Sequence, residues 1–294
     1  MKKIKILIPV YNDWQSVFKL LENIDSEVKY WDAEVSVLIV NDASTIKKPV
    51  KTFTFKKLKS VAVVNMKKNN GHARSIALGL KYLSNDGDFD YIVPLDGDGE
   101  DRPEELGLLF DKAKKNFNKV VVAERIKRSE GFLFRFCYII HVYLTFIFTG
   151  KLIKFGNYTF LPKTFVVEII KDPALWNSFA GTITKLAKTK VSIPSIRGGR
   201  YFGVSKMNFI NLARHSLSMI SVFKKILLIR SIFFLISYIF LIAGSFSVIT
   251  LIPAVAVIIM MISVIILSRR ENMFAFSNSL ENIDSIDEIN RNIL

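Results

Sequence analysis

Five carboxylates lie within the eleven residues 94–104, whose sequence is PLDGDGEDRPE. Asp96 and Asp98 are separated by one glycine and followed by another. Carboxylate oxygens are ligands that Mg²⁺ and Mn²⁺ accept, and glycine lets the backbone approach a bound diphosphate closely. The spacing therefore predicts a site for a divalent metal and a diphosphate.

The acidic segment has two other interpretations. A calcium loop between two helices needs Gly at its sixth position and Glu at its twelfth. Counted from Asp96, those positions hold Asp101 and Gly107, so this interpretation is excluded. A solvated acidic turn before a helix that begins at Pro103 stays open for Glu104 and Glu105, because acidic residues are favourable in a first helical turn.

An uncharged segment near the C-terminus predicts a membrane hairpin. Residues 231–267 contain no Asp, Glu, Lys, Arg or His. One helix of that length would extend about 55 Å, whereas two spans of about 18 residues fit a hydrocarbon core of ~30 Å. We expect the turn within 244–253, which is rich in Gly, Ser, Thr and Pro. Lys and Arg flank both ends, which favours a cytoplasmic location for both.

The chain is basic as a whole, with 41 Lys and Arg against 26 Asp and Glu in 294 residues. Such a charge can indicate nucleic acid, but beside a membrane hairpin it is better explained by anionic lipid headgroups and phosphorylated substrates. We therefore expect membrane lipid as a partner and no nucleic acid. The single cysteine, Cys137, excludes an internal disulfide and agrees with a reducing compartment.

Apolar runs that alternate with helical patterns predict an α/β fold with a mostly parallel sheet. The expected strands are 5–10, 35–40, 60–65, 90–94 and 119–123, and the expected helices are 14–25, 73–83 and 103–115. Polar clusters at 12–13, 41–44, 69–72 and 94–104 each follow a strand. Because ligands bind at the carboxyl ends of parallel strands, four loops should converge on one site.

Two further segments have helical patterns. Residues 132–149 are apolar but contain Arg135 and His141, so we expect an interfacial helix, with a buried core helix as the alternative. Residues 281–294 place four isoleucines at helical spacing, which predicts a helix for a partner, possible homo-oligomerisation included, or else a frayed tail. Those isoleucines are Ile283, Ile286, Ile289 and Ile293.

The segments IPVYND, IVNDAST, NNGHARSIALGL and LDGDGEDRPE, in this order, resemble the successive motifs of family 2 glycosyltransferases with the nucleotide-sugar-binding GT-A fold. AERIKR and RYFGVSK resemble the polyprenyl-phosphate hexosyltransferase branch, the relatives of dolichyl-phosphate mannose synthase. The resemblance implies a Rossmann-like GT-A domain followed by a two-helix transmembrane hairpin. We expect a cytoplasmic catalytic domain at 1–225, the hairpin at 226–268 and a cytoplasmic tail at 269–294.

The resemblance also implies roles for individual residues. The nucleotide sugar would be bound by Pro9, Tyr11, Asp13, Asp42 and Asp96. The metal, Mg²⁺ or Mn²⁺, would be held by Asp96, Asp98 and Glu100. Asp98 and Arg200 would be catalytic, with Arg200 facing the donor diphosphate. The acceptor phosphate would be received by Arg125, Arg128, Arg135, Ser205 and Lys206, the last two beside Arg200. His72 has no assigned role.

The activity that the resemblance implies is inverting transfer of a hexose from a nucleotide diphosphate sugar to a polyprenyl phosphate, of undecaprenyl type, at the cytoplasmic face of the inner membrane. The sequence departs from the family at Asp13, Asn41, Arg102 and the segment GNYTF at 156–160, so no sugar preference carries over. Three alternatives stay open: a glycan acceptor with Asp101 as base, a nucleotidyltransferase, and a non-catalytic membrane subunit.

Overall fold

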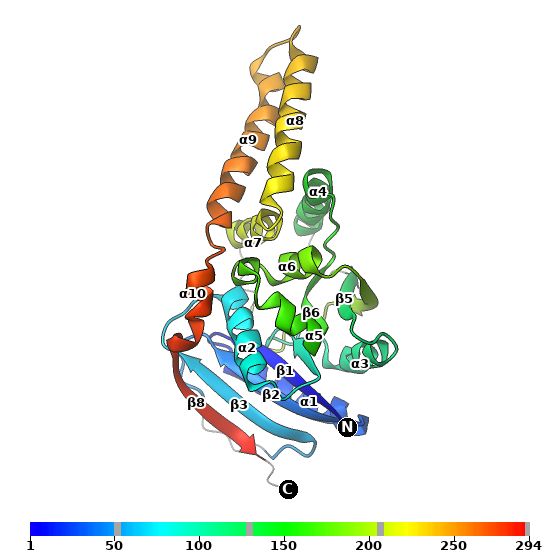
Figure 1. Cartoon of the computed structure of the whole chain (residues 1–294), viewed down its shortest axis with the longest axis vertical. Coiled ribbons are helices and arrows are strands. Elements are labelled where there is room, and N and C mark those ends of the chain that lie inside the picture. The colour runs from blue at the N-terminus through cyan, green and yellow to red at the C-terminus, as the bar shows by residue number, and fades with distance from the viewer. Residues whose placement is uncertain (50–53, 128–131, 205–208, 292–294) are drawn as a thin grey trace.

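A central sheet of eight strands organises the molecule, with a helical hairpin projecting from one end (Figure 1). The computed structural model describes residues 1–49, 54–127, 132–204 and 209–291. The strand order is β7-β5-β6-β4-β1-β2-β3-β8. The strands are β1 Lys2–Val10, β2 Ala33–Asn41, β3 Leu58–Met66, β4 Tyr91–Pro94, β5 Val120–Lys127, β6 Phe155–Pro162, β7 Lys190–Ile196 and β8 Ile283–Arg291.

The sheet is mostly parallel, as predicted. β1 pairs in parallel with β2 and β4, β2 with β3, and β5 with β7. β6 runs antiparallel to β4 and β5, and β8 runs antiparallel to β3. All five strands expected from the apolar runs are present as β1 to β5, so the carboxyl ends of β1 to β4 meet along one edge.

Both faces of the sheet are covered, which explains why the strands are apolar without alternation. On one face, Ile4, Ile6 and Ile8 of β1 belong to a core shared with α1 (Trp14–Glu27) and α3 (Leu106–Lys114). On the other face, Leu7 belongs to a second core with α2 (His72–Asp86), α5 (Lys163–Ile169) and α6 (Phe179–Leu186). Short 3₁₀ turns are η1 Val28–Tyr30, η2 Pro103–Glu105, η3 Pro173–Trp176 and η4 Ser279–Asn282.

The predicted hairpin consists of α8 (Lys224–Ile242) and α9 (Val248–Ser268). Both helices are long and apolar enough to cross a membrane, and most of their large side chains are exposed. The turn at 243–247 overlaps the predicted region 244–253, and the Ser247 hydroxyl accepts a hydrogen bond from Thr250 N at the start of α9. The two helices therefore form an apolar unit that the rest of the molecule leaves uncovered except near its foot.

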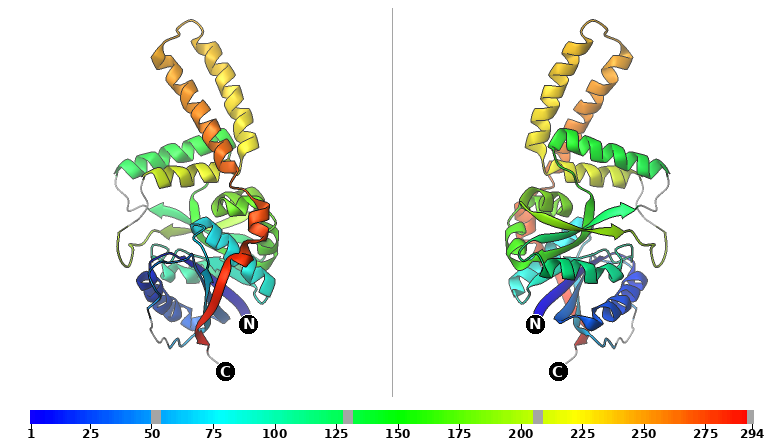
Figure 2. Two further views of the ribbon diagram at one scale, coloured as in Figure 1. Left: turned by 90° about the vertical axis from the view of Figure 1, so that its left-hand side faces the viewer. Right: turned by 90° about the vertical axis from the view of Figure 1, so that its right-hand side faces the viewer.

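Two further helices lie across the foot of the hairpin, α4 (Phe132–Thr149) and α7 (Phe209–Ser221) (Figure 2). A small core joins them to the hairpin, formed by Phe148, Ile220, Leu227, Val257 and Val264. In the described part of α4, Ile139, Tyr143 and Ile147 are exposed. The described part of α4 is therefore not enclosed as a core helix would be, and the expectation of an interfacial helix stays a prediction.

The C-terminal helix expected at 281–294 is wrong, because Ile283–Arg291 form the edge strand β8; Ile293, the last of the four isoleucines, lies outside the described residues. After α9 the chain forms α10 (Met273–Ser277), in which Phe276 is buried and stacks on Trp176, and then returns to the sheet. β8 pairs with β3, and Asn65 Nδ2 donates to Ser285 Oγ (3.0 Å) and Asp287 Oδ2 (3.2 Å). The open backbone groups of β3 decide the structure of this segment, since an unpaired edge favours strand addition.

Candidate functional site

The loops that follow the first strands are joined by hydrogen bonds, as their positions at one edge of the sheet predicted. Asn12 N donates to Ser44 Oγ (2.9 Å), and Asn12 Nδ2 donates to Thr45 Oγ1 (3.0 Å). Asn12 Oδ1 accepts from Ile46 N (2.9 Å). Asn12 has a positive φ of 54°, a backbone conformation that Asn tolerates better than most residues.

Asp42 holds the loop that leads into α2. Its Oδ1 accepts from Asn70 N and its Oδ2 from Gly71 N, both at 2.8 Å. The side chain is enclosed, since Asp42 is 3% exposed. Asp42 therefore positions the start of α2, and its expected contact with the donor nucleoside stays a prediction.

The acidic loop at 95–102 is fastened to a segment that we term the basic strap, residues 197–201. Arg197 Nε donates to Glu100 Oε2 (2.7 Å). Gly198 N donates to Glu100 O (2.9 Å) and Tyr201 N to Asp98 O (2.9 Å). Two segments that are far apart in the sequence are thus joined by backbone hydrogen bonds and by a contact between a basic and an acidic side chain.

Arg200, also in the basic strap, contacts two of the predicted site residues. Its Nη1 lies 2.6 Å from Asp98 Oδ2, and its Nη2 lies 2.7 Å from Asp13 Oδ2. Its Nε is buried and finds no acceptor among the described residues. The guanidinium is therefore positioned by two carboxylates, and its buried Nε–H is a donor for a further group.

Asp96 is held by two residues to which the sequence assigned no role. Asn157 Nδ2 donates to Asp96 Oδ1 (2.9 Å), and His72 Nε2 lies 3.1 Å from the same oxygen. Asn157 Nδ2 also lies 2.8 Å from His72 Nε2. The only available signal was that Asn157 falls in GNYTF, where the sequence departs from the family, and that His72 follows a glycine at a helix start.

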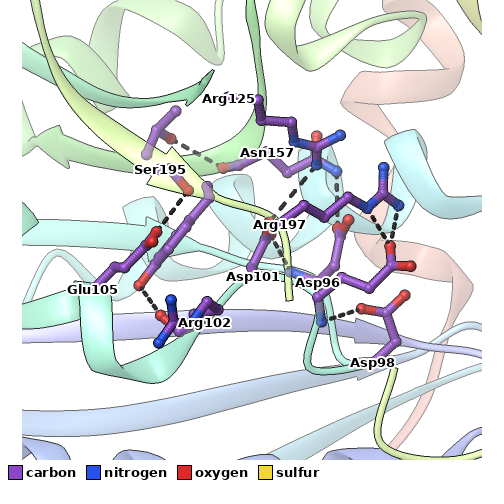
Figure 3. A network of polar contacts seen from close by, with 12 residues as sticks. Asp96, Asp98, Asp101, Arg102, Glu105, Arg125, Asn157, Ser195 and Arg197 are labelled. Atoms are coloured by element: carbon purple, nitrogen blue, oxygen red, sulfur yellow. Dashed lines mark hydrogen bonds and ion pairs between the residues drawn. The ribbon is translucent and has the colours of Figure 1, made fainter. Parts of the chain in front are cut away.

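Asp101 lies behind the loop and supports it from within. It is 5% exposed, its Oδ2 accepts from Asp96 N (3.0 Å), and its Oδ1 lies 3.7 Å from Arg125 Nη2. Arg125, predicted to receive the acceptor phosphate, is thus directed toward the acidic loop (Figure 3). Burial and the charge of Asp96 raise the pKa of Asp101 to about 7.

Of the other carboxylates in this region, Asp96 and Asp98 lie in the candidate site, whereas Glu105 supports the fold. Burial, followed by the charge of Asp96, raises the pKa of Asp98 to about 6. Burial also opposes ionisation of Asp96, but His72 and Asn157 outweigh it and lower the pKa of Asp96. Glu105 is buried and accepts hydrogen bonds from Ser195 Oγ (2.6 Å) and Ile196 N (2.9 Å) (Figure 3). The predicted solvated position is therefore wrong for Glu105, whose carboxylate instead binds Ser195 and Ile196 of β7.

The donor set fits a cation in part. Asp96 and Asp98 provide hard oxygen ligands at one loop, and after burial the charge of Asp96 is the next cause of the raised pKa of Asp98. Glu100, the third predicted ligand, is engaged by Arg197. Within the described ranges, no three His, Cys, Asp or Glu side chains are grouped as a preformed metal site. Asp98 is likewise paired with Arg200, so the metal-binding role of Asp96 and Asp98 stays a prediction.

Other predicted site residues lie at the margins of this cluster. Pro9 is buried at the end of β1, whereas Tyr11 is exposed in the loop after it. Three of the predicted acceptor-phosphate residues, Arg128, Ser205 and Lys206, lie outside the described residues. The side chain of Arg135, in α4, is likewise outside the described part of the molecule.

Residues 5–169 match the model of a known family, described as glycosyl transferase family 2. Among curated proteins, the chain is 24% identical over 225 residues to the undecaprenyl-phosphate 4-deoxy-4-formamido-L-arabinose transferase of Erwinia tasmaniensis. It is 26% identical over 218 residues to the transferase of the same name from Klebsiella pneumoniae. Each match includes 72% of this chain, which spans 65% and 64% of the length of these relatives.

Solved structures share the fold. A mannosyltransferase from Pyrobaculum calidifontis, solved with GDP-Man and Mn²⁺, aligns over 96% of this chain and 87% of its own, with a TM-score of 0.50 and 13% identity. Glucosyl-3-phosphoglycerate synthase from Mycobacterium tuberculosis, solved with Mn²⁺, UDP-glucose and phosphoglyceric acid, aligns over 77% and 80%, with a TM-score of 0.52 and 13% identity. The sheet and its helices therefore have the GT-A fold that the sequence predicted.

Proposed function

Since the chain belongs to glycosyl transferase family 2, we propose that it transfers a hexose from a nucleotide diphosphate sugar to a polyprenyl phosphate while anchored in a membrane by α8 and α9. The observation that carries the proposal is the chain of ion pairs from Asp13 through Arg200 to Asp98. It collects carboxylates and a phosphate-binding guanidinium at the carboxyl ends of β1 and β4, where ligands of parallel sheets bind.

The donor would lie with its diphosphate between the acidic loop and the basic strap. A guanidinium binds phosphate oxygens in a fixed bidentate geometry. Arg200 Nε, buried without an acceptor among the described residues, is a donor suited to such an oxygen. Tyr11, exposed beside the loop of Asp13, would line the nucleoside side of the same site.

A divalent metal, Mg²⁺ or Mn²⁺, would be held by Asp96 and Asp98 and would supply positive charge to the departing diphosphate. His72 and Asn157 would keep Asp96 ionised and oriented, because both contact its Oδ1. The Mn²⁺ present in the structures of the mannosyltransferase and the synthase supports a divalent ion in this fold.

The reaction is a single displacement. An oxygen of the lipid phosphate forms a bond to the anomeric carbon, and the bond from that carbon to the donor diphosphate breaks, so that the configuration inverts. Nucleoside diphosphate departs with the electron pair, and Arg200 stabilises its charge. Because a phosphate is already ionised near neutral pH, the attacking oxygen needs no strong general base.

The acceptor would reach this site from the membrane. The relatives from Erwinia tasmaniensis and Klebsiella pneumoniae are named for undecaprenyl phosphate, which supports a lipid phosphate acceptor. Exposed apolar side chains on α4, at the foot of the hairpin, suit contact with a lipid chain. Lys and Arg at both ends of the hairpin favour a catalytic domain on the cytoplasmic side of the inner membrane.

A glycan acceptor would require a base that touches the attacking hydroxyl. Asp101 is the candidate for this base, but its side chain is enclosed, since Asp101 is 5% exposed. Its carboxylate is also engaged by Arg125 and by Asp96 N. An assay tests the choice directly: membranes that contain the full chain receive a panel of labelled nucleotide sugars with polyprenyl phosphate and a free glycan side by side. Label in the organic extract supports the proposal, and label in the glycan alone contradicts it.

A further inference from the structure

A second charged site lies at the foot of the hairpin, away from the acidic loop. A cavity of about 820 Å³ opens between the first turn of α2, η3 and the segment that connects α9 with α10. Figure 1 shows α10 beside α2, directly below the end of α9. None of Asp13, Asp96, Asp98 and Arg200 lines this cavity, so it is separate from the proposed catalytic site.

The cavity is strongly basic. Four positive side chains line it, Lys68, Arg74, Arg269 and Arg270, against the carboxylate of Glu281. In the part of the chain that the structure describes, ion pairs of arginine with carboxylates involve other residues: Arg102, Arg125, Arg197 and Arg200. Among the described residues, the three cavity arginines are in no ion pair within 4.0 Å, although the charge of Asp42 acts on Arg74 from a greater distance.

Arg74 is the best positioned of these side chains. Its guanidinium lies over the ring of Trp176, with Cζ 5.3 Å from the ring centroid. Its Nε is buried and has no acceptor among the described residues, which is an unfavourable state for a charged donor. Burial lowers the pKa of Arg74, and the charge of Arg270 lowers it further. An anion at this point would relieve both penalties.

The sequence position of Arg269 and Arg270 indicates where the anion comes from. Both residues follow α9 directly, so with the hairpin in a bilayer they lie at the level of the lipid headgroups. The first turn of α2 borders the same cavity through Arg74, Asn70 borders it from the loop just before that helix, and the helix macrodipole adds positive potential.

We propose that this cavity is a binding site for a phosphate group, held by Arg74 of the catalytic domain together with Arg269 and Arg270 of the hairpin. Arginine matches phosphate through its planar, bidentate donors. The group can come from a phospholipid headgroup or from a free phosphate compound. In either case it would bridge two mutually repelling parts of the chain and fix the hairpin against α2.

The test uses the full chain in detergent micelles. Saturable binding and the apparent melting temperature are measured with phosphatidylglycerol, phosphatidylcholine and inorganic phosphate as probes. We expect phosphatidylglycerol or inorganic phosphate to bind and to raise the melting temperature, as a ligand of the native state does. Binding of phosphatidylglycerol alone identifies a lipid source, and competition by inorganic phosphate identifies a free phosphate source.

Three variants make the outcome specific. R269Q/R270Q should weaken binding by about tenfold or more, since hydrogen bonds to charged groups are lost. Lys225→Gln removes a charge at the start of α8, outside the cavity, and should leave binding unchanged. Glu281→Gln removes the opposing carboxylate and should tighten binding by about twofold. The proposal is overturned if neither phosphatidylglycerol nor inorganic phosphate binds. It is also overturned if R269Q/R270Q binds as the wild type does, or if Lys225→Gln weakens binding as much as R269Q/R270Q.

Discussion

Arg200 binds Asp13 and Asp98 at the same time, with Nη2 2.7 Å from Asp13 Oδ2 and Nη1 2.6 Å from Asp98 Oδ2. Asp13 follows β1 and Asp98 follows β4, whereas Arg200 follows β7. One guanidinium thus connects the segments that follow three strands. Its two terminal nitrogens, Nη1 and Nη2, hold the two carboxylates side by side.

Replacement of Arg200 should affect transfer and leave folding intact. Arg200→Gln is expected to lower the transfer rate by about a hundredfold or more, the size of effect found when one donor to a developing negative charge is removed. Arg200→Lys should recover only part of that loss, because an ammonium cannot contact both carboxylates through a planar fork. Rates are measured in membranes with saturating donor.

Arg102→Lys is the matched control for Arg200. Arg102 lies in the acidic loop but is directed to Glu104 at the surface, with Nε 3.5 Å from Oε2. Its replacement should leave transfer unchanged. If Arg102→Lys and Arg200→Lys reduce transfer alike, the loop is sensitive to any change and the role given to Arg200 is wrong.

Gly99 should tolerate no side chain. Its φ is +87°, and a Cβ built on it would lie 2.5 Å from the ring of Tyr201. Gly99→Ala should therefore displace the basic strap and lower transfer by about tenfold to a hundredfold, since small misplacements of catalytic groups have large effects. Gly107→Ala is the control: a Cβ there meets no heavy atom within 4 Å, and transfer should be unchanged. Equal rates for both variants would contradict the prediction.

Asn157 is a positioning residue for Asp96. Asn157→Ala removes the donor to Asp96 Oδ1 and should lower kcat by about tenfold, the value of a hydrogen bond to a charged group. Asn157→Asp should be worse, because it adds a carboxylate beside Asp96. Asn116→Ala removes an amide that donates to the Lys112 carbonyl, far from the site, and serves as the control. A wild-type kcat for Asn157→Ala would exclude the role.

α10 should be held to the domain by one aromatic side chain. Phe276 is 1% exposed and stacks on Trp176 at 5.4 Å, whereas Phe274 is 78% exposed. Phe276→Ala should lower the free energy of unfolding by about 3–5 kcal/mol, a decrease of roughly 10 °C in melting temperature for a chain of this size. Phe274→Ala should shift it by a degree or two at most. A stable Phe276→Ala variant would show that β8 alone retains the C-terminal segment.

The sheet was predictable from the sequence because its strands are buried on both faces. The runs at 5–10 and 35–40 are apolar without interruption, and each is followed by polar residues where the ligand-binding edge lies. The edge strand β8 was not predictable in the same way. Its isoleucines have helical spacing, and the strand depends on partners in β3 such as Asn65, which local sequence does not reveal.

The candidate site was predictable where a motif carried it. Asp96, Asp98 and Arg200 came from ordered segments with a recognisable pattern, and the structure brings Asp98 and Arg200 into contact. Asn157 and His72 are single polar residues on separate elements, and only the tertiary fold brings them together at Asp96. Glu105 was misjudged because helix-start preferences favour an exposed acid, whereas its burial depends on β7.

The measurement that tests the central proposal most directly is a product balance with the full chain in membranes. Labelled nucleotide sugar and polyprenyl phosphate are supplied, and nucleoside diphosphate and organic-soluble label are quantified together. The proposal predicts one labelled lipid for each nucleoside diphosphate released, and loss of both products in Asp98→Asn but not in the surface variant Asp111→Asn. Release of nucleoside diphosphate without labelled lipid, or release of pyrophosphate, would contradict it.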